Sequence, residues 1–256
     1  MLLAVDIGNS SITVGVFHEE GRLLSENRLQ TVVGKSADEY AILLQGLFSL
    51  YGIDRGALTE SIVSSVVPSL THAVCAAVEQ LLGAPPKVVG PGIKTGLNIR
   101  IDAQAQLGAD LVANAVGALE CCQPPMVIAD LGTATTLTVI GKSGALEGVV
   151  IAPGVRLSLN ALSNHGAELP DSDVASPKRL IAKNTGDSMR AGVVIGHAAM
   201  LEGLLERIEE ELGSPVTVPI TGGLAEAVLP HCRRAYLHRP HLTLEGLCAI
   251  ARKNRK

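Results

Sequence analysis

The sequence predicts an α/β protein built from two duplicated domains. Apolar, β-branched segments alternate with segments of helical periodicity in both halves of the chain, and this alternation indicates helices layered on sheets. The polar turn at residues 6–11 returns at residues 130–136, about half a chain later, with a strand expected on each side of both turns. A repeat of that length is typical of a duplicated domain rather than of a solenoid.

The first half of the chain is expected to open with a hairpin and to continue with helices and strands in alternation. Apolar residues at 2–5 and an alternating pattern at 12–17 predict two strands, and 21–24 predict the next turn and strand. Ser36 is suited to cap a helix over 37–51. The remaining expected elements are a strand at 61–67 ending at Pro68, a helix at 70–82 ending at Gly83, a short strand at 87–89 and a helix at 109–120.

The second half repeats this order. Strands are expected at 126–129 and 137–140, on either side of the second turn, and at 148–151. The other expected elements are a helix at 157–164, a long helix at 188–212 stopped by Gly213 and Pro215, a strand at 216–220, a short helix after 224 and a final helix at 242–252. Residues 166–185 are expected to be rich in loops, and no element is predicted for 95–106.

The composition excludes several kinds of recognition. The chain has 256 residues, 47% hydrophobic and only 2% aromatic, with no Trp. This apolar content is not that of a disordered chain. The scarcity of aromatic rings argues against base stacking on single-stranded nucleic acid and against an adenine held between rings. A net charge of -4 provides no overall basic field for nucleic acid or anionic lipid.

Three further observations bear on the compartment and on metals. No apolar run reaches the length of a membrane span, and the N-terminus lacks the positive region of a signal peptide. Five cysteines without framework spacing suit the reducing cytosol, so we expect a cytoplasmic protein. His231, Cys232, His238 and His241 lie close in sequence, but their spacing fits no common zinc template, and ordinary surface and core roles are favoured.

The two Asp-x-Gly turns are the strongest candidates for a binding site. A strand that ends in Asp and turns through Gly offers main-chain N–H groups to an anion, and the carboxylate suits Mg²⁺, which prefers oxygen ligands and bridges phosphates. A single such motif favours a plain hairpin turn, whereas its repetition favours a phosphate site. The residues concerned are Asp6, Gly8, Asn9, Ser10 and Ser11 in the first turn, and Asp130, Gly132, Thr133, Thr135 and Thr136 in the second.

A third candidate is the turn after the strand expected at 216–220. Gly222 and Gly223 permit a ligand to approach the backbone closely at the end of a strand. A flat base can lie directly against such peptide planes, although a simple tight turn is an equally good interpretation of this motif alone.

Taken together, these turns resemble those of the actin–hexokinase–chaperone ATPase superfamily, and the chain is similar in more detail to the type III pantothenate kinases. The ordered motifs that carry the closer resemblance lie at residues 6–10, 64–68, 90–96, 108–110, 130–136, 152–154, 183–185, 221–224 and 242–247. The resemblance implies two ribonuclease H-like domains, expected at 1–117 and 118–256, with a nucleotide cleft between them. Each motif is weak alone, whereas the ordered combination is specific.

The resemblance also implies roles for individual residues. Asp6, with Asn9 and Ser10, would hold Mg²⁺ and the phosphates of ATP, and Thr133 and Thr135 would contact phosphate. Asp130 would help to bind a monovalent cation, K⁺ or NH₄⁺. Asp110, in the motif of Gly108 and Ala109 that also binds substrate, would accept the proton of the pantothenate hydroxyl. Thr185 would reach the pantothenate site of a neighbouring subunit, because family members are homodimers with shared sites.

Two positions depart from the family pattern. Leu111 stands where the family usually has Arg directly after the aspartate, and this change removes a charged contact to an acidic substrate. Thr138 stands where an Asp is common. Arg100 and Arg156 are candidates to replace the missing arginine.

The sequence therefore predicts a cytoplasmic homodimeric kinase that phosphorylates pantothenate with ATP, the first step of coenzyme A biosynthesis. No nucleic acid or membrane partner is expected. A divergent paralogue that binds nucleotide as a regulatory protein, or that phosphorylates another small alcohol, is the alternative suggested by Leu111. A nucleotide-hydrolysing switch of the same superfamily is a third possibility.

Overall fold

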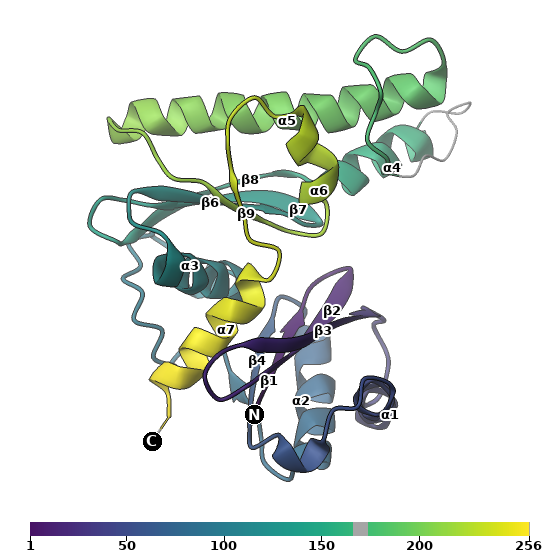
Figure 1. Ribbon diagram of the computed structural model, residues 1–256, viewed down its shortest axis with the longest axis vertical. Helices are drawn as coiled ribbons and strands as arrows, with labels where there is room; N and C mark the ends of the chain where they lie inside the picture. The colour runs from purple at the N-terminus through teal and green to yellow at the C-terminus, as the bar shows by residue number, and fades with distance from the viewer. Residues whose placement is uncertain (166–173, 256) are drawn as a thin grey trace. The chain divides into compact units, whose positions relative to one another are not determined.

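The computed structural model describes residues 1–165 and 174–255, and it divides into two compact units (Figure 1). Unit 1 comprises Met1–Leu97, Asp102–Cys121 and His241–Lys256, and unit 2 comprises Asn98–Ile101 and Cys122–Pro240. None of the described helices is both long enough and apolar enough to cross a membrane. All five cysteines are free thiols.

Unit 1 is organised around a five-stranded mixed sheet of order β3-β2-β1-β4-β5. The first three strands are antiparallel, and β4 and β5 continue the sheet parallel to β1. The strands are β1 (Leu2–Ile7), β2 (Ser11–Phe17), β3 (Leu23–Gln30), β4 (Glu60–Ser65) and β5 (Lys87–Val88). The predicted hairpin is confirmed, and β3 is longer than predicted because it pairs along the whole of β2.

The helices of unit 1 are α1 (Ala37–Leu50), α2 (Pro68–Leu82), α3 (Ala109–Cys121) and α7 (Leu242–Lys253), with 3-10 turns η1 (Arg55–Ala57) and η2 (Gln104–Gln106). The predicted cap of α1 is confirmed, because the Ser36 side chain and Glu39 form a reciprocal capping box. Gly83 ends α2 in the left-handed conformation that glycine favours.

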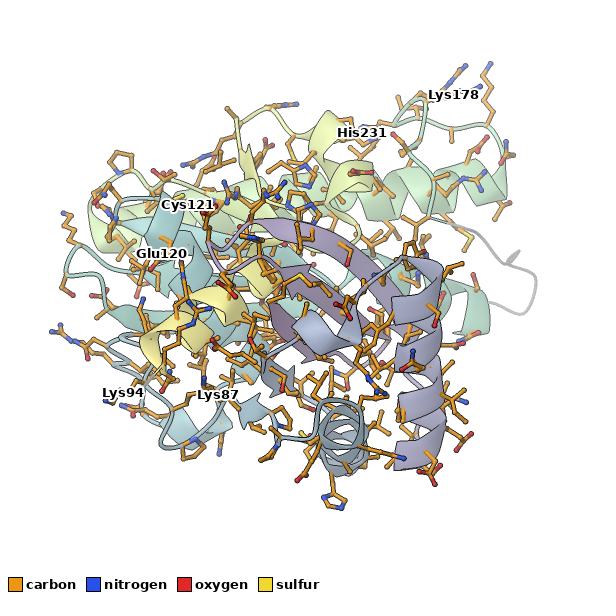
Figure 2. All side chains as sticks on the ribbon, turned by 60° about the horizontal axis from the view of Figure 1, so that its bottom comes forward. Lys87, Lys94, Glu120, Cys121, Lys178 and His231 are labelled. Carbon is orange, nitrogen blue, oxygen red and sulfur yellow. The ribbon has the colours of Figure 1, made fainter. Side chains whose placement is uncertain are left out.

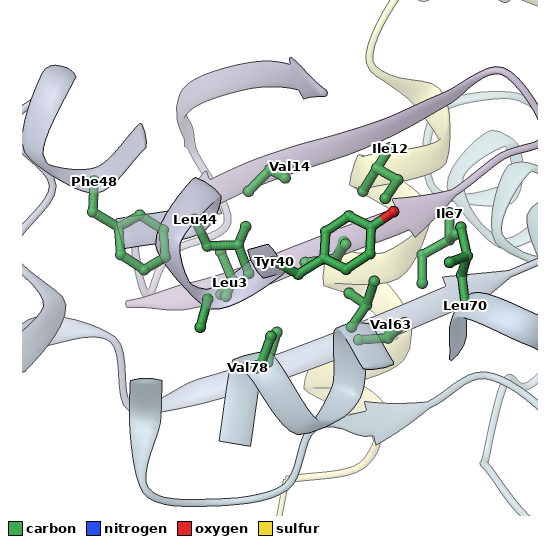
Figure 3. Packing of buried hydrophobic residues seen from close by; sticks show 14 of the residues in the cluster. Leu3, Ile7, Ile12, Val14, Tyr40, Leu44, Phe48, Val63, Leu70 and Val78 are labelled. Carbon is green, nitrogen blue, oxygen red and sulfur yellow. The ribbon is translucent and has the colours of Figure 1, made fainter. Parts of the chain in front are cut away.

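The main core of unit 1 lies between the sheet and the helix pair α1 and α2 (Figure 3). Tyr40 and Phe48, two of the few aromatic residues, are each 1% exposed within it. The Tyr40 hydroxyl donates to the Val32 carbonyl oxygen over 3.1 Å, so the one polar atom of this large side chain is satisfied. The sheet that carries the first polar turn is therefore supported on one face by a well-packed core.

Helices α3 and α7 pack together at unusually close range inside unit 1. A Cβ added to Gly246 would overlap the Ala113 carbonyl group, and one added to Gly117 would lie 2.7 Å from the Leu242 carbonyl oxygen. At the far end of α7, Arg252 and Lys253 each pair with Glu120 over 3.1 Å; Glu120 is labelled in Figure 2. Arg252 and Lys253 lie in the last turn of α7, where basic side chains interact favourably with the helix dipole.

This packing divides the chain differently from the predicted bounds of 1–117 and 118–256. The final helix was expected in the second domain, but residues 241–256 belong to unit 1. The reason is the pair of apposed glycines on α3 and α7, together with the packing of α7 on β1 and β4. A contact between segments so distant in sequence leaves no local signal in the chain.

Unit 2 repeats the sheet of unit 1. Its strand order, β10-β9-β6-β7-β8, is that of unit 1 read from the other edge, with the same antiparallel and parallel pairs. The strands are β6 (Met126–Leu131), β7 (Ala134–Ile140), β8 (Leu146–Pro153), β9 (Pro219–Thr221) and β10 (Leu237–His238). The predicted α/β class with two duplicated domains is confirmed.

The helices of unit 2 are α4 (Val155–His165), α5 (Thr185–Leu212) and α6 (Ala225–Val228), followed by a 3-10 turn η3 (Leu229–His231). Buried residues of these helices and of the sheet form the second core. The strand predicted at 216–220 is shorter than expected and begins at Pro219. In the region without a predicted element, Ile99 bridges to Leu146. Part of the predicted loop, 166–173, lies outside the described residues.

Candidate active site

The first polar turn connects β1 to β2 and is held by its own main chain and by Thr31. The Gly8 N–H donates to the Ser11 carbonyl oxygen over 3.0 Å. From the end of β3, the Thr31 hydroxyl donates to the Gly8 carbonyl oxygen over 2.7 Å, and the Thr31 N–H donates to the Ser10 carbonyl oxygen over 3.2 Å. Asn9 and Ser10 are exposed at the tip, where a ligand can reach them.

Asp6 lies at the end of β1, directly opposite Ser64 on the parallel strand β4. Ser64 is fully buried, and its hydroxyl donates to Oδ1 of Asp6 over 2.5 Å. A hydrogen bond to a carboxylate is among the stronger ones in proteins and restricts the orientation of the group. The carboxylate predicted to hold Mg²⁺ is therefore oriented by Ser64, which lies in the motif at residues 64–68.

The second polar turn connects β6 to β7 at the equivalent place in unit 2. The Gly132 N–H donates to the Ala134 carbonyl oxygen over 3.1 Å, and Thr133 is exposed at the tip. Gly154, just before α4, presses against this turn: a Cβ there would lie 2.6 Å from the Gly132 carbonyl oxygen and would overlap that of Thr133. Only glycine permits so close an approach of two backbones.

Thr135 and Asp130 occupy different environments at this turn. Thr135 is 2% exposed, and its hydroxyl forms a 2.7 Å hydrogen bond with Nε2 of the buried His197 on α5. Its side chain thus faces the helix layer, whereas Thr133 is presented at the tip. Asp130 is partly buried at the end of β6 and lies in register with Thr221 of β9, as Asp6 lies with Ser64.

The third turn follows β9 and packs on the second. Gly222 has a φ of +96°, and a Cβ there would lie 2.5 Å from both N and C of Leu131 and 2.6 Å from Oδ1 of Asp130. The Leu224 N–H donates to the Leu131 carbonyl oxygen over 3.2 Å. Gly222 is therefore required for a left-handed backbone and a close contact, and Gly223 is the exposed residue of the pair.

Asp110 is the second residue of α3, and it is partly buried. Burial raises the pKa of its carboxyl group, and the Leu111 N–H, which donates to Oδ1 over 2.8 Å, opposes that shift. A Cβ on Gly108 would overlap Oδ1 of Asp110, so a larger residue there would require this carboxylate to shift. A carboxylate of raised pKa at a helix N-terminus is well suited to accept a proton near neutral pH.

The two departures from the family pattern are both buried. Leu111 is 8% exposed in unit 1, and Thr138 is 1% exposed on β7. The candidate replacement residues Arg100 and Arg156 are exposed and belong to unit 2, with Arg156 two residues after Gly154. An arginine at position 111 would have to leave the buried site that the leucine side chain fills.

Thr185 begins α5 and is exposed beside a pocket in unit 2. The volume of the pocket is about 580 Å³. Its charged lining consists of Lys178 (labelled in Figure 2), Arg179, Lys183, Arg190 and Asp187. Arg190 pairs with Asp187 over 2.6 Å.

The zinc alternative gains no support from the described residues, in which no group of three or more His, Cys, Asp or Glu side chains is placed to hold a metal ion. His231 instead forms a 2.8 Å hydrogen bond with Ser176. The N-cap residue His241 contacts Glu26.

Sequence reasoning assigned no role to Thr31, Ser64, Gly154 or His197. The last three contact residues of another strand, turn or layer, and such contacts leave no pattern in the local sequence. Ser64 and Gly154 lie in motifs that carry the family resemblance, but these motifs do not indicate which contacts the two residues make. Nothing in the sequence marked His197, which stands in the middle of a long helix.

Fold and turns together define a duplicated α/β protein, in which two mixed sheets of the same topology each carry an Asp-x-Gly turn. In solved structures the fold recurs in a Campylobacter jejuni protein assigned to the Baf family of transcriptional activators, with a TM-score of 0.62, 17% identity and 98% of each chain covered. It recurs in the activator of 2-hydroxyisocaproyl-CoA dehydratase from Clostridium difficile with bound ADPNP, with a TM-score of 0.53 and 12% identity, covering 100% of this chain and 98% of that one.

The sequence comparisons are more specific. A family model described as type III pantothenate kinase matches residues 2–207. Curated type III pantothenate kinases from Geotalea uraniireducens and Myxococcus xanthus are 41% and 40% identical, over 100% and 99% of each chain, respectively. The chain belongs to the type III pantothenate kinase family.

Proposed function

We propose that the protein transfers the γ-phosphoryl group of ATP to the primary hydroxyl of pantothenate, giving 4'-phosphopantothenate in the first step of coenzyme A biosynthesis. Family membership over the full chain supports this reaction. The single structural observation that carries it is the pair of Asp-x-Gly turns in register-matched positions of two duplicated sheets. Phosphoryl transfer consists mostly of positioning and charge stabilisation, which such turns supply.

Residues of this chain have separate roles in the proposed reaction. Exposed N–H and hydroxyl groups at Asn9, Ser10 and Thr133 bind phosphate oxygens. Asp110 accepts the proton of the substrate hydroxyl as that oxygen attacks phosphorus, and its raised pKa favours this transfer. The turn at Gly222 and Gly223 offers exposed backbone to the base, and with few aromatic residues in the chain we expect base selectivity to be weak.

The donor sets fit the ions implied by the family. Asp6, oriented by Ser64 beside the first turn, suits Mg²⁺, and Asp130, at the matching place in unit 2, suits a monovalent cation such as K⁺. Such ions supply charge neutralisation on the phosphates when bound. We further propose a cytoplasmic homodimer in which Thr185, exposed at the start of α5, contributes to the partner's pantothenate site.

The direct test is production of phosphopantothenate by the purified protein with ATP, Mg²⁺ and pantothenate, with K⁺ or with Na⁺ in its place. We expect turnover that depends on pantothenate and that is higher with K⁺. ATP hydrolysis that is indifferent to pantothenate would instead identify a nucleotide-hydrolysing switch. GTP, CTP and UTP are expected to serve as donors, and strict selectivity for ATP would contradict the weak base recognition.

Leu111 favours one second candidate, a divergent paralogue with little pantothenate turnover, and Leu111→Arg tests it. We expect an active wild type, and an arginine variant destabilised by about 2 kcal/mol or more, because the guanidinium group must leave the buried site and the packing of the leucine side chain is lost. Leu111→Met is the matched control that preserves the apolar packing. A near-silent wild type that gains strongly from arginine would establish the paralogue.

A further inference from the structure

The hydrogen bond between Thr135 and His197 joins the second phosphate turn to the long helix α5. The two residues are 2% and 5% exposed, and the distance between Oγ1 and Nε2 is 2.7 Å. The apolar core of unit 2 includes Leu137, two residues after Thr135 on β7, and Val194 and Leu201, three residues before and four residues after His197 on α5. A polar bond in a buried setting favours the arrangement that keeps it, because breaking it leaves both groups away from water without this bond.

This bond acts on a turn that is already restricted from two other directions. Gly154 touches the Gly132 and Thr133 carbonyl groups, and Gly222 touches the backbone of Leu131. Both are close steric contacts, which prevent the turn from moving toward Gly154 or toward Gly222. The bond to His197 is attractive and holds the first residues of β7 toward α5.

We propose that His197 is a positioning residue for ATP: through Thr135 it holds the second phosphate turn where its N–H groups and the Thr133 hydroxyl meet the phosphates. This inference rests on the proposed function only in its choice of ligand. Burial also lowers the pKa of His197, so the ring is neutral at neutral pH and its bond to Thr135 requires no counter-charge.

The test compares His197→Leu, which fills the site without the bond, with wild type by calorimetric titration of a non-hydrolysable ATP analogue with Mg²⁺. The dissociation constant is expected to rise about tenfold or more, because small displacements of positioning groups have large effects. The KM for pantothenate is expected to change less than twofold, a difference that a general loss of structure would not produce.

Two further sets of variants complete the test. Thr135→Val removes the hydroxyl at nearly constant volume, whereas Thr135→Ser retains the hydroxyl and should keep the affinity of the wild type. The double variant Thr135→Val with His197→Leu should bind the analogue no more weakly than the weaker-binding of the two single variants. Leu205→Ala, fully buried further along α5, is the control for destabilisation and should lower the melting temperature without weakening nucleotide binding.

The outcomes separate the two proposals. Wild-type analogue affinity in His197→Leu, or an equal loss in Leu205→Ala, overturns the positioning role. Additive losses in the double variant overturn action through Thr135. Nucleotide binding without any phosphopantothenate would defeat the proposed reaction while leaving the positioning role supported, provided that His197→Leu still weakens binding.

Discussion

Asp110→Asn is expected to lower the turnover number by about 10²- to 10⁴-fold, the usual contribution of a general base. The amide keeps the size of the side chain but cannot accept the proton from the substrate hydroxyl. Affinity for the ATP analogue should be nearly unchanged, because the phosphate turns are intact. Steady-state kinetics and calorimetry measure the two effects separately.

Asp38→Asn is the matched control for this variant. Asp38 is the second residue of α1, as Asp110 is of α3, but it is exposed. Its replacement removes the same favourable interaction with a helix dipole, worth about 0.3–1 kcal/mol, and should leave turnover unchanged. Full turnover in Asp110→Asn would remove Asp110 from its role as base.

The same pair of variants gives a pH-dependent prediction. Burial raises the pKa of Asp110 above its ordinary value of 3.8, so the folded protein retains this proton more strongly than the unfolded chain. Stability contributed by this group therefore falls as pH rises from 3.8 through the raised pKa, and the loss is complete above it.

Asp110→Asn is expected to be more stable than wild type above that window, with the gain disappearing toward pH 3.8. Denaturant unfolding at several pH values measures the difference. Asp38→Asn should show no such gain. A lower stability of Asp110→Asn at neutral pH would mean that the helix dipole outweighs burial.

Gly246→Ala is expected to cost about 3 kcal/mol or more in unfolding free energy, at the upper end of overpacking effects. The added methyl group would overlap the Ala113 carbonyl group on α3, and this group is backbone, which cannot rotate away as a flexible side chain can. Helix α7 would have to move away from α3, and this movement would also disturb its packing on β1 and β4. Thermal and denaturant unfolding measure the loss.

Gly46→Ala on α1 is the control, since nothing lies within 4 Å of the added atom. It is expected to be neutral or to stabilise by up to about 1 kcal/mol, because alanine restricts the unfolded chain and favours helix. Equal stability of the two variants would contradict the close packing of α3 and α7.

Much of the fold and part of the site follow from local sequence. Ser36 and Glu39 indicate the start of α1, because the two residues of a capping box are only three positions apart. The two Asp-x-Gly turns can be predicted from the sequence because each turn directly connects the two strands that flank it. Their repetition indicates duplication. The turn glycines were predicted from short motifs, whereas the role of Asp110 was predicted from the resemblance to the family.

Tertiary structure decided which of these residues act together. The helix layer that Thr135 faces depends on the side of the sheet covered by α5, and the partner of Asp6 depends on the register of β4 against β1. The place of α7 in unit 1 depends on glycines in two helices more than 100 residues apart in the chain. Sequence alone determined the elements and the class of chemistry, because those signals are local and periodic. The contacts that orient the candidate site depended on long-range packing, which no local pattern encodes.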